Sequence, residues 1–272
     1  MTLKFWKMNG AGNDFVVLDN RDKSLDLTRE QIAHLCDRQR GVGADGLLAV
    51  EPAEGGADFR MRYYNADGGE AEMCGNGARC FAQFARSLDP AKASAEKISF
   101  ETIAGVIKAE FEGQNIRIEL SEPFDLELDT DLAVDGELLA INSINTGVPH
   151  AVVFVEDLET IDVRRLGSAI RHHNHFKPAG TNANFAQVLG PDHIAIRTYE
   201  RGVEDETLAC GTGMVACAIV HFELNEGDRP IRVQVRGGDT LEVNFRKTRD
   251  GDFKDVTLLG PAELTFSGTI DI

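Results

Sequence analysis

Short stretches of alternating or continuous apolar residues recur along the whole chain and predict a strand-rich protein. Val152–Val155 and Ile231–Val235 are typical, and turn-forming residues separate such stretches from one another. In the first half they predict strands over residues 3–8, 14–19, 46–51, 58–65, 97–102, 104–111 and 115–120. In the second half they predict strands over residues 150–156, 184–189, 193–199, 230–236, 239–246 and 254–260.

Helical signals are few. One helix is expected over about residues 29–39, with Thr28 as N-cap and Gln31 closing a capping box. Others are expected over about 162–173, from Asp162, and after two glycine clusters over 75–88 and 211–224. Because the few helices are segregated among many strands, the pattern favours an α+β fold over a doubly wound sheet.

The chain carries an internal repeat. Met73–Ala78 resembles Ala209–Met214, and their cysteines are 210 − 74 = 136 residues apart, half of the 272 residues. Further matches keep the same order along the chain: Gly12–Val17 with Gly147–Val152, Gly43–Asp45 with Asn182–Asn184, and Arg62–Asn65 with Arg197–Glu200. Two copies of one unit explain this, with a boundary around Ser121–Asp135, where proline and acidic residues gather.

Composition narrows the function classes. The chain has 28 basic and 45 acidic residues, a net charge of −17, and an isoelectric point near 4.8. Such a surface repels nucleic acids and anionic membranes, and no apolar run is long enough to span a bilayer. The first residues lack a signal-peptide pattern, and five cysteines are an odd count for a disulfide framework. We therefore expect a reduced, cytoplasmic protein that binds neither nucleic acid nor membrane.

The two Cys-Gly-x-Gly elements, at Cys74 and Cys210, carry the most specific chemistry. Glycines allow a tight turn and close approach to a ligand. The first N–H groups of a helix have no partner within the helix, so this end binds carboxylate or phosphate. It also lowers the pKa of a nearby thiol. Two such thiols facing one carbon suit racemisation, in which one removes a proton and the other delivers one to the opposite face.

Three other interpretations remain open. Zinc could use four of the cysteines, but five and six intervening residues are not common zinc spacings, so Cys36, Cys80 and Cys217 are better interpreted as small core residues. A nucleophilic cysteine paired with His150 would suit a hydrolase but leaves the second glycine motif unexplained. A non-catalytic amino-acid-binding module would need the glycine loops but not the thiols.

The motifs together resemble the diaminopimelate epimerase family. The resemblance rests on Lys7–Phe15, Asn65–Gly68, Met73–Cys80, Tyr199–Gly202 and Ala209–Gly213. It implies two pseudo-symmetric domains, over 1–120 and 121–261, each a curved sheet or barrel around a central helix. The last strand, 262–272, would return to the first domain, and the active site would lie in the cleft between the domains. The implied reaction interconverts LL- and meso-2,6-diaminopimelate without pyridoxal phosphate, for lysine and often peptidoglycan synthesis.

The resemblance also implies a role for each matching residue. Cys74 and Cys210 would be the acid/base thiols, the former for the L centre and the latter for the D centre, and His150 and Glu200 would tune them. The reacting carboxylate would be cradled by Gly75, Asn76, Gly211 and Thr212. The distal end of the substrate would be bound by Asn13, Asn65, Asn182 and Arg201, and Glu200 would bind the substrate as well. Arg79 is interpreted as a structural ion-pair partner.

The chain departs from some family members at the distal end. Gly46 and Val148 stand where some members carry Gln and Asn. A sister racemase acting on proline, histidine or another amino acid is therefore the main alternative. In either case we expect a small amino-acid substrate, no cofactor, no metal and a homodimer.

Overall fold

The computed structural model describes residues 1–225 and 228–272, and these form two compact units. Unit 1 comprises Met1–Glu119 and Leu259–Ile272, and unit 2 comprises Leu120–Leu258. The interpretation of the units as two epimerase halves around one active site stays a prediction at this point. No helix within the described residues is long and apolar enough to cross a membrane.

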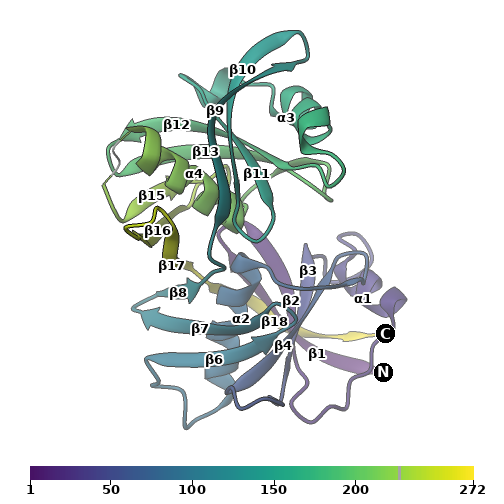
Figure 1. Ribbon diagram of the computed structural model, residues 1–272. Helices are drawn as coiled ribbons and strands as arrows, with labels where there is room; N and C mark the ends of the chain where they lie inside the picture. The colour runs from purple at the N-terminus through teal and green to yellow at the C-terminus, as the bar shows by residue number, and fades with distance from the viewer. Residues whose placement is uncertain (226–227) are drawn as a thin grey trace. The chain divides into compact units, whose positions relative to one another are not determined.

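Unit 1 is a curved sheet around helix α2 (Gly75–Leu88) (Figure 1). A second helix, α1 (Arg29–Cys36), packs against β3. Its strands are β1 (Thr2–Gly10), β2 (Asn13–Asp19), β3 (Gly46–Glu51), β4 (Phe59–Asn65), β5 (Glu70–Ala71), β6 (Lys97–Thr102), β7 (Gly105–Glu112), β8 (Asn115–Glu119) and β18 (Glu263–Asp271). The hydrogen-bonded order is β18–β1–β2–β3–β4–β6–β7–β8, with β5 also on β4, and the β2–β3 and β4–β6 pairs are parallel. Because α2 contacts β1 to β4 and also β8, the sheet must wrap round it.

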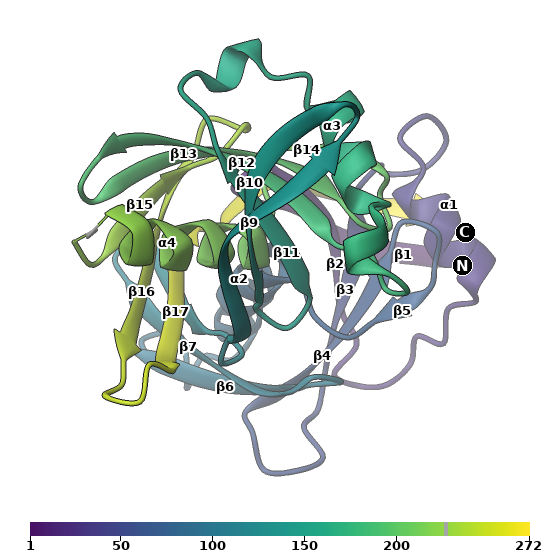
Figure 2. The ribbon, with the colours of Figure 1, turned by 45° about the horizontal axis from the view of Figure 1, so that its top comes forward.

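Unit 2 repeats this plan around helix α4 (Gly211–Asn225) (Figure 2). Helix α3 (Val163–Arg171) takes the place of α1, and two short 3₁₀ helices are η1 (Leu158–Thr160) and η2 (Asn174–Phe176). The strands are β9 (Phe124–Val134), β10 (Glu137–Asn145), β11 (Pro149–Phe154), β12 (Asn182–Gly190), β13 (His193–Glu200), β14 (Asp205–Thr207), β15 (Ile231–Gln234), β16 (Thr240–Lys247) and β17 (Phe253–Pro261). The pairs β11–β12 and β13–β15 are parallel, as their counterparts are in unit 1.

The strand registers define which residues of the two units are equivalent. Phe15 lies opposite Gly46 in unit 1, and His150 lies opposite Asn182 in unit 2. The next strand pair in each unit gives the same alignment, because Leu48 lies opposite Tyr63 in unit 1 and Asn184 lies opposite Thr198 in unit 2. The equivalent pairs are therefore Phe15 and His150, Gly46 and Asn182, Leu48 and Asn184, and Tyr63 and Thr198. The expected match of Gly43–Asp45 with Asn182–Asn184 is wrong by three residues.

The predicted fold class, an α+β protein with two repeated curved sheets around central helices, is confirmed. The helix expected over 75–88 is found with those bounds. The helix expected over 29–39 begins with the predicted capping box but ends at Cys36, because Asp37 is extended and its side chain accepts from the N–H groups of Gln39 and Arg40. The helix expected over 162–173 is shorter as well, Val163–Arg171, with Asp162 as its N-cap.

The sequence missed the hairpin of β9 and β10. Most side chains of β9 are exposed, so this strand lacks the apolar alternation that marks a strand with one buried face. The acidic segment in which a domain boundary was expected, around Ser121–Asp135, is thus mostly strand β9. In the repeat, the antiparallel pair of β9 and β10 in unit 2 is equivalent to the pair of β18 and β1 in unit 1.

Candidate active site

Cys74 is the N-cap of α2. Its backbone is extended (φ −140°, ψ 122°), its side chain does not cap the helix, and its carbonyl accepts the first helical bond from the N–H of Ala78 at 2.7 Å. The N–H groups of Gly75, Asn76 and Gly77 have no acceptor within a helix of this geometry. A half-buried thiol therefore lies beside three backbone donors at the positive end of the helix.

A hydrogen-bonded pair of asparagines lies next to this helix start. The buried Asn76 donates through Nδ2 to Oδ1 of Asn13, and Asn76 Oδ1 accepts from the Arg79 guanidinium at 2.9 Å. Asn13 Nδ2 in turn donates to the Asp45 carboxylate at 3.0 Å. Arg79 also donates to the backbone carbonyls of Gly10 and Pro261. Asn13 and Asn76 are thus brought together, and Arg79 bonds to the predicted site residue Asn76, a contact that the sequence analysis missed.

Cys210 precedes α4 in the same way. Its carbonyl accepts from the N–H of Met214 at 2.9 Å, and the residue is 7% exposed. Its Sγ lies 3.6 Å from Oγ1 of Thr212. A Cβ at Gly213 would lie 2.5 Å from Asn184 Oδ1 and 3.3 Å from the Cys210 sulfur. Glycine is required at this position because any side chain would push the thiol and the amide apart.

His150 is held between Thr212 and Asn184. Its Nε2 lies 2.9 Å from Thr212 Oγ1 and its Nδ1 lies 3.1 Å from Asn184 Nδ2. Burial, with a smaller contribution from the charge of Arg201, lowers the pKa of His150 to about 3. The imidazole is therefore neutral at pH 7 and is a weak base, which disfavours the hydrolase interpretation.

Asn182 and Arg201 also lie together in unit 2. Asn182 Oδ1 accepts from the backbone N–H of Arg201 at 2.9 Å, and its Nδ2 donates to the carbonyl of Pro149 at 3.0 Å. Glu200 ends β13 immediately before Arg201. In unit 1, the position equivalent to Glu200 is Asn65, which ends β4 and accepts from the Tyr63 hydroxyl at 2.9 Å.

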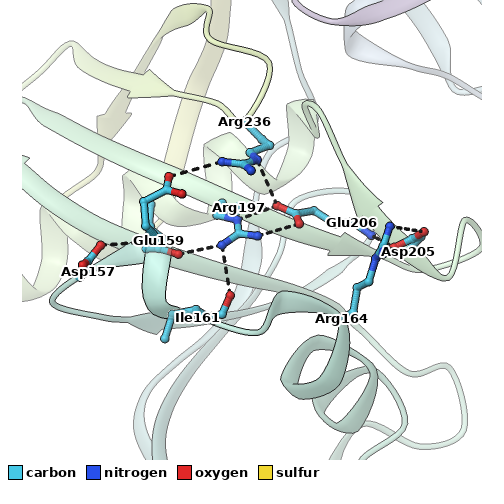
Figure 3. Close-up of polar contacts among 9 residues, drawn as sticks. Asp157, Glu159, Ile161, Arg164, Arg197, Asp205, Glu206 and Arg236 are labelled. Carbon is cyan, nitrogen blue, oxygen red and sulfur yellow. Dashed lines mark hydrogen bonds and ion pairs between the residues drawn. The ribbon is translucent and has the colours of Figure 1, made fainter.

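An ion-pair cluster holds the segment between Glu200 and Cys210 (Figure 3). Arg197 and Glu206 form a two-bond pair at 2.6 and 2.8 Å, and Arg197 also donates to the carbonyls of Leu158 and Ile161. Arg236 lies within ion-pair distance of both Glu206 and Glu159. These bonds fix β14 against β13, three residues before Cys210.

The remaining cysteines are core residues, as predicted. Cys36, Cys80 and Cys217 are at most 3% exposed. Burial raises the pKa of Cys36 and of Cys80 to about 12 and raises that of Cys217 further, so all three are unreactive thiols.

Comparison with known proteins decides the family. The family model described as diaminopimelate epimerase matches residues 5–123 and 142–262. A diaminopimelate epimerase of Aquifex aeolicus (strain VF5) is 45% identical over 280 residues, with 98% of each chain covered. The chain belongs to the diaminopimelate epimerase family. Its predicted class, an isomerase of the epimerase type, is thereby confirmed.

Solved structures share the fold of this diaminopimelate epimerase family member at low sequence identity. A phenazine biosynthesis protein of the PhzF family from Bacillus anthracis superposes with a TM-score of 0.76 at 17% identity, with 100% of both chains covered. A probable proline racemase from Agrobacterium radiobacter K84 gives 0.72 at 14% identity, with 99% of this chain and 92% of that chain covered. At such identities the comparison shows the fold alone.

The structure connects the predicted site residues to others that the sequence analysis did not select. Asn184 is hydrogen-bonded to both Thr198 and His150. Asp45 is hydrogen-bonded to Asn13, and Arg79 to Asn76. A signal for Asn184 was present, because it lies among small and apolar residues in the buried first half of β12, where an amide is uncommon. The shifted alignment of the repeat concealed that its equivalent in unit 1 is Leu48.

Proposed function

We propose that this family member converts LL-2,6-diaminopimelate to meso-2,6-diaminopimelate without a cofactor, using Cys74 and Cys210 as its acid/base pair. The observation that carries the proposal is that each of two repeated units starts its central helix with Cys-Gly-x-Gly, in a chain of the diaminopimelate epimerase family. The relatives' names supply the substrate, and the repeated thiols supply the chemistry.

The proposed reaction transfers two protons: one from the α-carbon to the first sulfur, and one from the second sulfur to the α-carbon. The thiolate of one cysteine takes the α-proton, so that an S–H bond forms as the C–H bond breaks. The thiol of the other cysteine then gives its proton to the opposite face of the carbon and becomes the thiolate. Negative charge that spreads from the carbon into its carboxylate is stabilised by the N–H groups of Gly75, Asn76, Gly211 and Thr212. The steps balance without metal or pyridoxal phosphate.

The proposed distal subsite discriminates diaminopimelate from shorter amino acids. Asn13, Asn65, Asn182 and Arg201 supply amide and guanidinium groups, which pair well with an ammonium and a carboxylate. Arg201 offers the fork for the distal carboxylate, and its backbone is held by Asn182. Glu200 and His150 would tune the thiols from the same unit as Cys210.

We also propose a cytoplasmic homodimer that acts in lysine synthesis and supplies a peptidoglycan precursor. These proposals rest on the family resemblance. Light scattering of the purified protein tests the dimer, and a mass of one chain at micromolar concentration would contradict it.

The function is tested by incubating reduced protein with LL-diaminopimelate in D₂O and following the α-proton by NMR. We expect loss of the α-proton signal and appearance of the meso isomer. The Cys74→Ala and Cys210→Ala variants should show neither, whereas Cys36→Ala, a core cysteine on α1, should retain turnover.

Two other outcomes would change the proposal. Exchange with another amino acid but not with diaminopimelate would keep the two-thiol mechanism and assign the chain to a sister racemase. Absence of exchange with every amino acid, from folded and reduced protein, would leave the binding-module interpretation.

A further inference from the structure

A cluster of buried polar side chains lies beneath the start of α4. His150, Asn184 and Thr198 are at most 2% exposed and are hydrogen-bonded to one another. The equivalent residues of unit 1 are Phe15, Leu48 and Tyr63, whose two rings pack edge to face at 6.2 Å. Because Phe15 and Leu48 fill the positions of His150 and Asn184 in the repeat, the fold does not require polar residues there, and burying them has a desolvation cost.

The amide of Asn184 has only one acceptable orientation. Its Nδ2 lies 2.9 Å from the carbonyl oxygen of Ala151, which can only accept, and its Oδ1 lies 2.9 Å from the hydroxyl of Thr198, which donates to it. A flipped amide would place two oxygens against each other at Ala151. The side-chain nitrogen of Asn184 therefore faces His150.

This orientation determines the protonation of His150. One N–H of Asn184 goes to Ala151, and the other points at His150 Nδ1 at 3.1 Å. A nitrogen that accepts a hydrogen bond carries no proton, so the proton of the neutral ring is on Nε2. The lowered pKa of His150 agrees with a ring that stays neutral.

The Nε2 proton continues the chain toward the sulfur. Nε2 donates to Oγ1 of Thr212 at 2.9 Å, which leaves the threonine hydroxyl proton to point elsewhere. Cys210 Sγ lies 3.6 Å from that hydroxyl, within the range of a hydrogen bond to sulfur. The backbone of Thr212 is fixed by a bond from the Thr146 hydroxyl to its carbonyl at 3.0 Å.

We propose that Asn184 is a positioning residue that fixes His150 as its Nε2–H tautomer, so that donors run from Asn184 through His150 and Thr212 to the Cys210 sulfur. This direction stabilises a thiolate at Cys210 and opposes a thiol donating into the protein. The catalytic value of the chain rests on the proposed function, whereas the tautomer does not. In unit 1, Phe15 and Leu48 cannot form an equivalent chain beneath Cys74.

The tautomer is tested by two-bond ¹H–¹⁵N NMR of protein with ¹⁵N-labelled histidine. The chain has seven histidines, and the His150 signals are those missing from a His150→Gln variant. We expect a protonated Nε2 and an unprotonated Nδ1 at pH 7, unchanged on acidification to pH 5. A proton on Nδ1, or an imidazolium at pH 7, in the wild-type protein would overturn the proposal.

Two variants of unit 2 separate positioning from packing. In Asn184→Asp an acceptor replaces the donor, so we expect a proton on His150 Nδ1. Thr198→Val removes only the bond to Oδ1 of Asn184 and should keep the wild-type tautomer. An unchanged tautomer in folded Asn184→Asp would contradict the assignment.

The last link is tested through the reactivity of Cys210. Iodoacetamide labelling of Cys210 is followed against pH by peptide mass spectrometry, which requires no turnover. Thr212→Val should raise the midpoint by about one pH unit, because a hydrogen bond to a charged sulfur is lost, and Thr212→Ser should restore it. Equal labelling midpoints in the wild type, Thr212→Val and Thr212→Ser would overturn this link. The result does not depend on which amino acid is the substrate.

Discussion

The starts of α2 and α4 share a backbone but differ in what lies beneath them. Both begin with a cysteine whose carbonyl accepts the first helical hydrogen bond, and both continue with Gly-x-Gly. Beneath α2 a Cβ at Gly77 would meet Phe15 and Leu48 at 3.4 Å. Beneath α4 the equivalent Gly213 faces Asn184 and the Cys210 sulfur.

This difference distinguishes the features that the fold requires in both units from those that only unit 2 has. The glycines and the N–H groups without a helical acceptor are common to both helix starts, so under the proposed function each unit offers its own carboxylate cradle. The buried polar residues His150 and Asn184 belong to unit 2. At the equivalent positions of unit 1, Phe15 and Leu48 are packed instead. The two cysteines therefore share the first hydrogen bond of their helices and differ in the residues that lie beneath them.

The largest expected effect is on the sulfur atoms themselves. Cys74→Ser and Cys210→Ser should each lower kcat at least about 10³-fold, because a hydroxyl is a much weaker acid than a thiol and neither helix start can replace the other. Steady-state kinetics with LL- and meso-diaminopimelate measures this. Retention of a tenth of kcat by either variant would show that one thiol is dispensable.

Exchanging the residues beneath the helices should have unequal results. His150→Phe, which gives unit 2 the residue of unit 1, removes the donor to Thr212 and should lower kcat by about 10- to 100-fold. The reverse exchange, Phe15→His, buries an imidazole against Leu48 without a partner and should cost about 2–4 kcal/mol of unfolding free energy. Kinetics and urea unfolding measure the two effects, and a His150→Phe variant with full kcat would remove His150 from the mechanism.

Acid should destabilise unit 2 through His150. Its folded pKa of about 3 lies below the usual unfolded value of about 6.5. The unfolded chain takes up this proton as the pH falls below about 6.5, whereas the folded chain does so only near pH 3. The stability contributed by the neutral ring is therefore present above pH 6.5 and is lost on acidification. Relative to His150→Phe, the wild-type unfolding free energy should fall by up to about 1.4 kcal/mol per pH unit between pH 6 and pH 4. Parallel curves for the two proteins would contradict a buried neutral His150.

The last expected effect concerns an ion pair that both units contain. Arg62 pairs with Glu70 in unit 1 as Arg197 pairs with Glu206 in unit 2, but the second pair is less exposed and Arg197 also bonds two backbone carbonyls. Arg197→Gln should cost about 2–3 kcal/mol of unfolding free energy and Arg62→Gln about 1 kcal/mol. Denaturant titration of both variants checks the order, and a larger loss for Arg62→Gln would reverse it.

Much of the fold could be predicted because its signals are local. The Cys-Gly-x-Gly elements mark the start of α2 and α4, and the apolar run Met214–Phe222 predicts the buried helix that the structure shows. Strand β9 could not be predicted in this way, because it is held by pairing with β10 and not by a buried apolar face.

The candidate site was predictable in its thiols but not in its supports. Cys74, Cys210 and His150 stand in recognisable motifs, whereas Asn184 acquires its role only when β12 lies parallel to β11. A shift of three residues in the aligned repeat was enough to conceal its pairing with Leu48. Arg79 was interpreted as an ion-pair partner, since no sequence pattern shows that its side chain bends back to Asn76 three residues earlier.

The most direct test of the account asks whether the two unequal thiols serve one reaction centre. Protein without substrate is treated with diamide, which takes up the two electrons and two protons released by two thiols, and the peptides are mapped by mass spectrometry. We predict a disulfide between Cys74 and Cys210. Activity should fall in proportion to the disulfide formed and return when reductant is added, whereas Cys36→Ala protein kept reduced should lose no activity. Oxidised, inactive protein in which Cys74 and Cys210 both remain free to react with iodoacetamide would contradict the account.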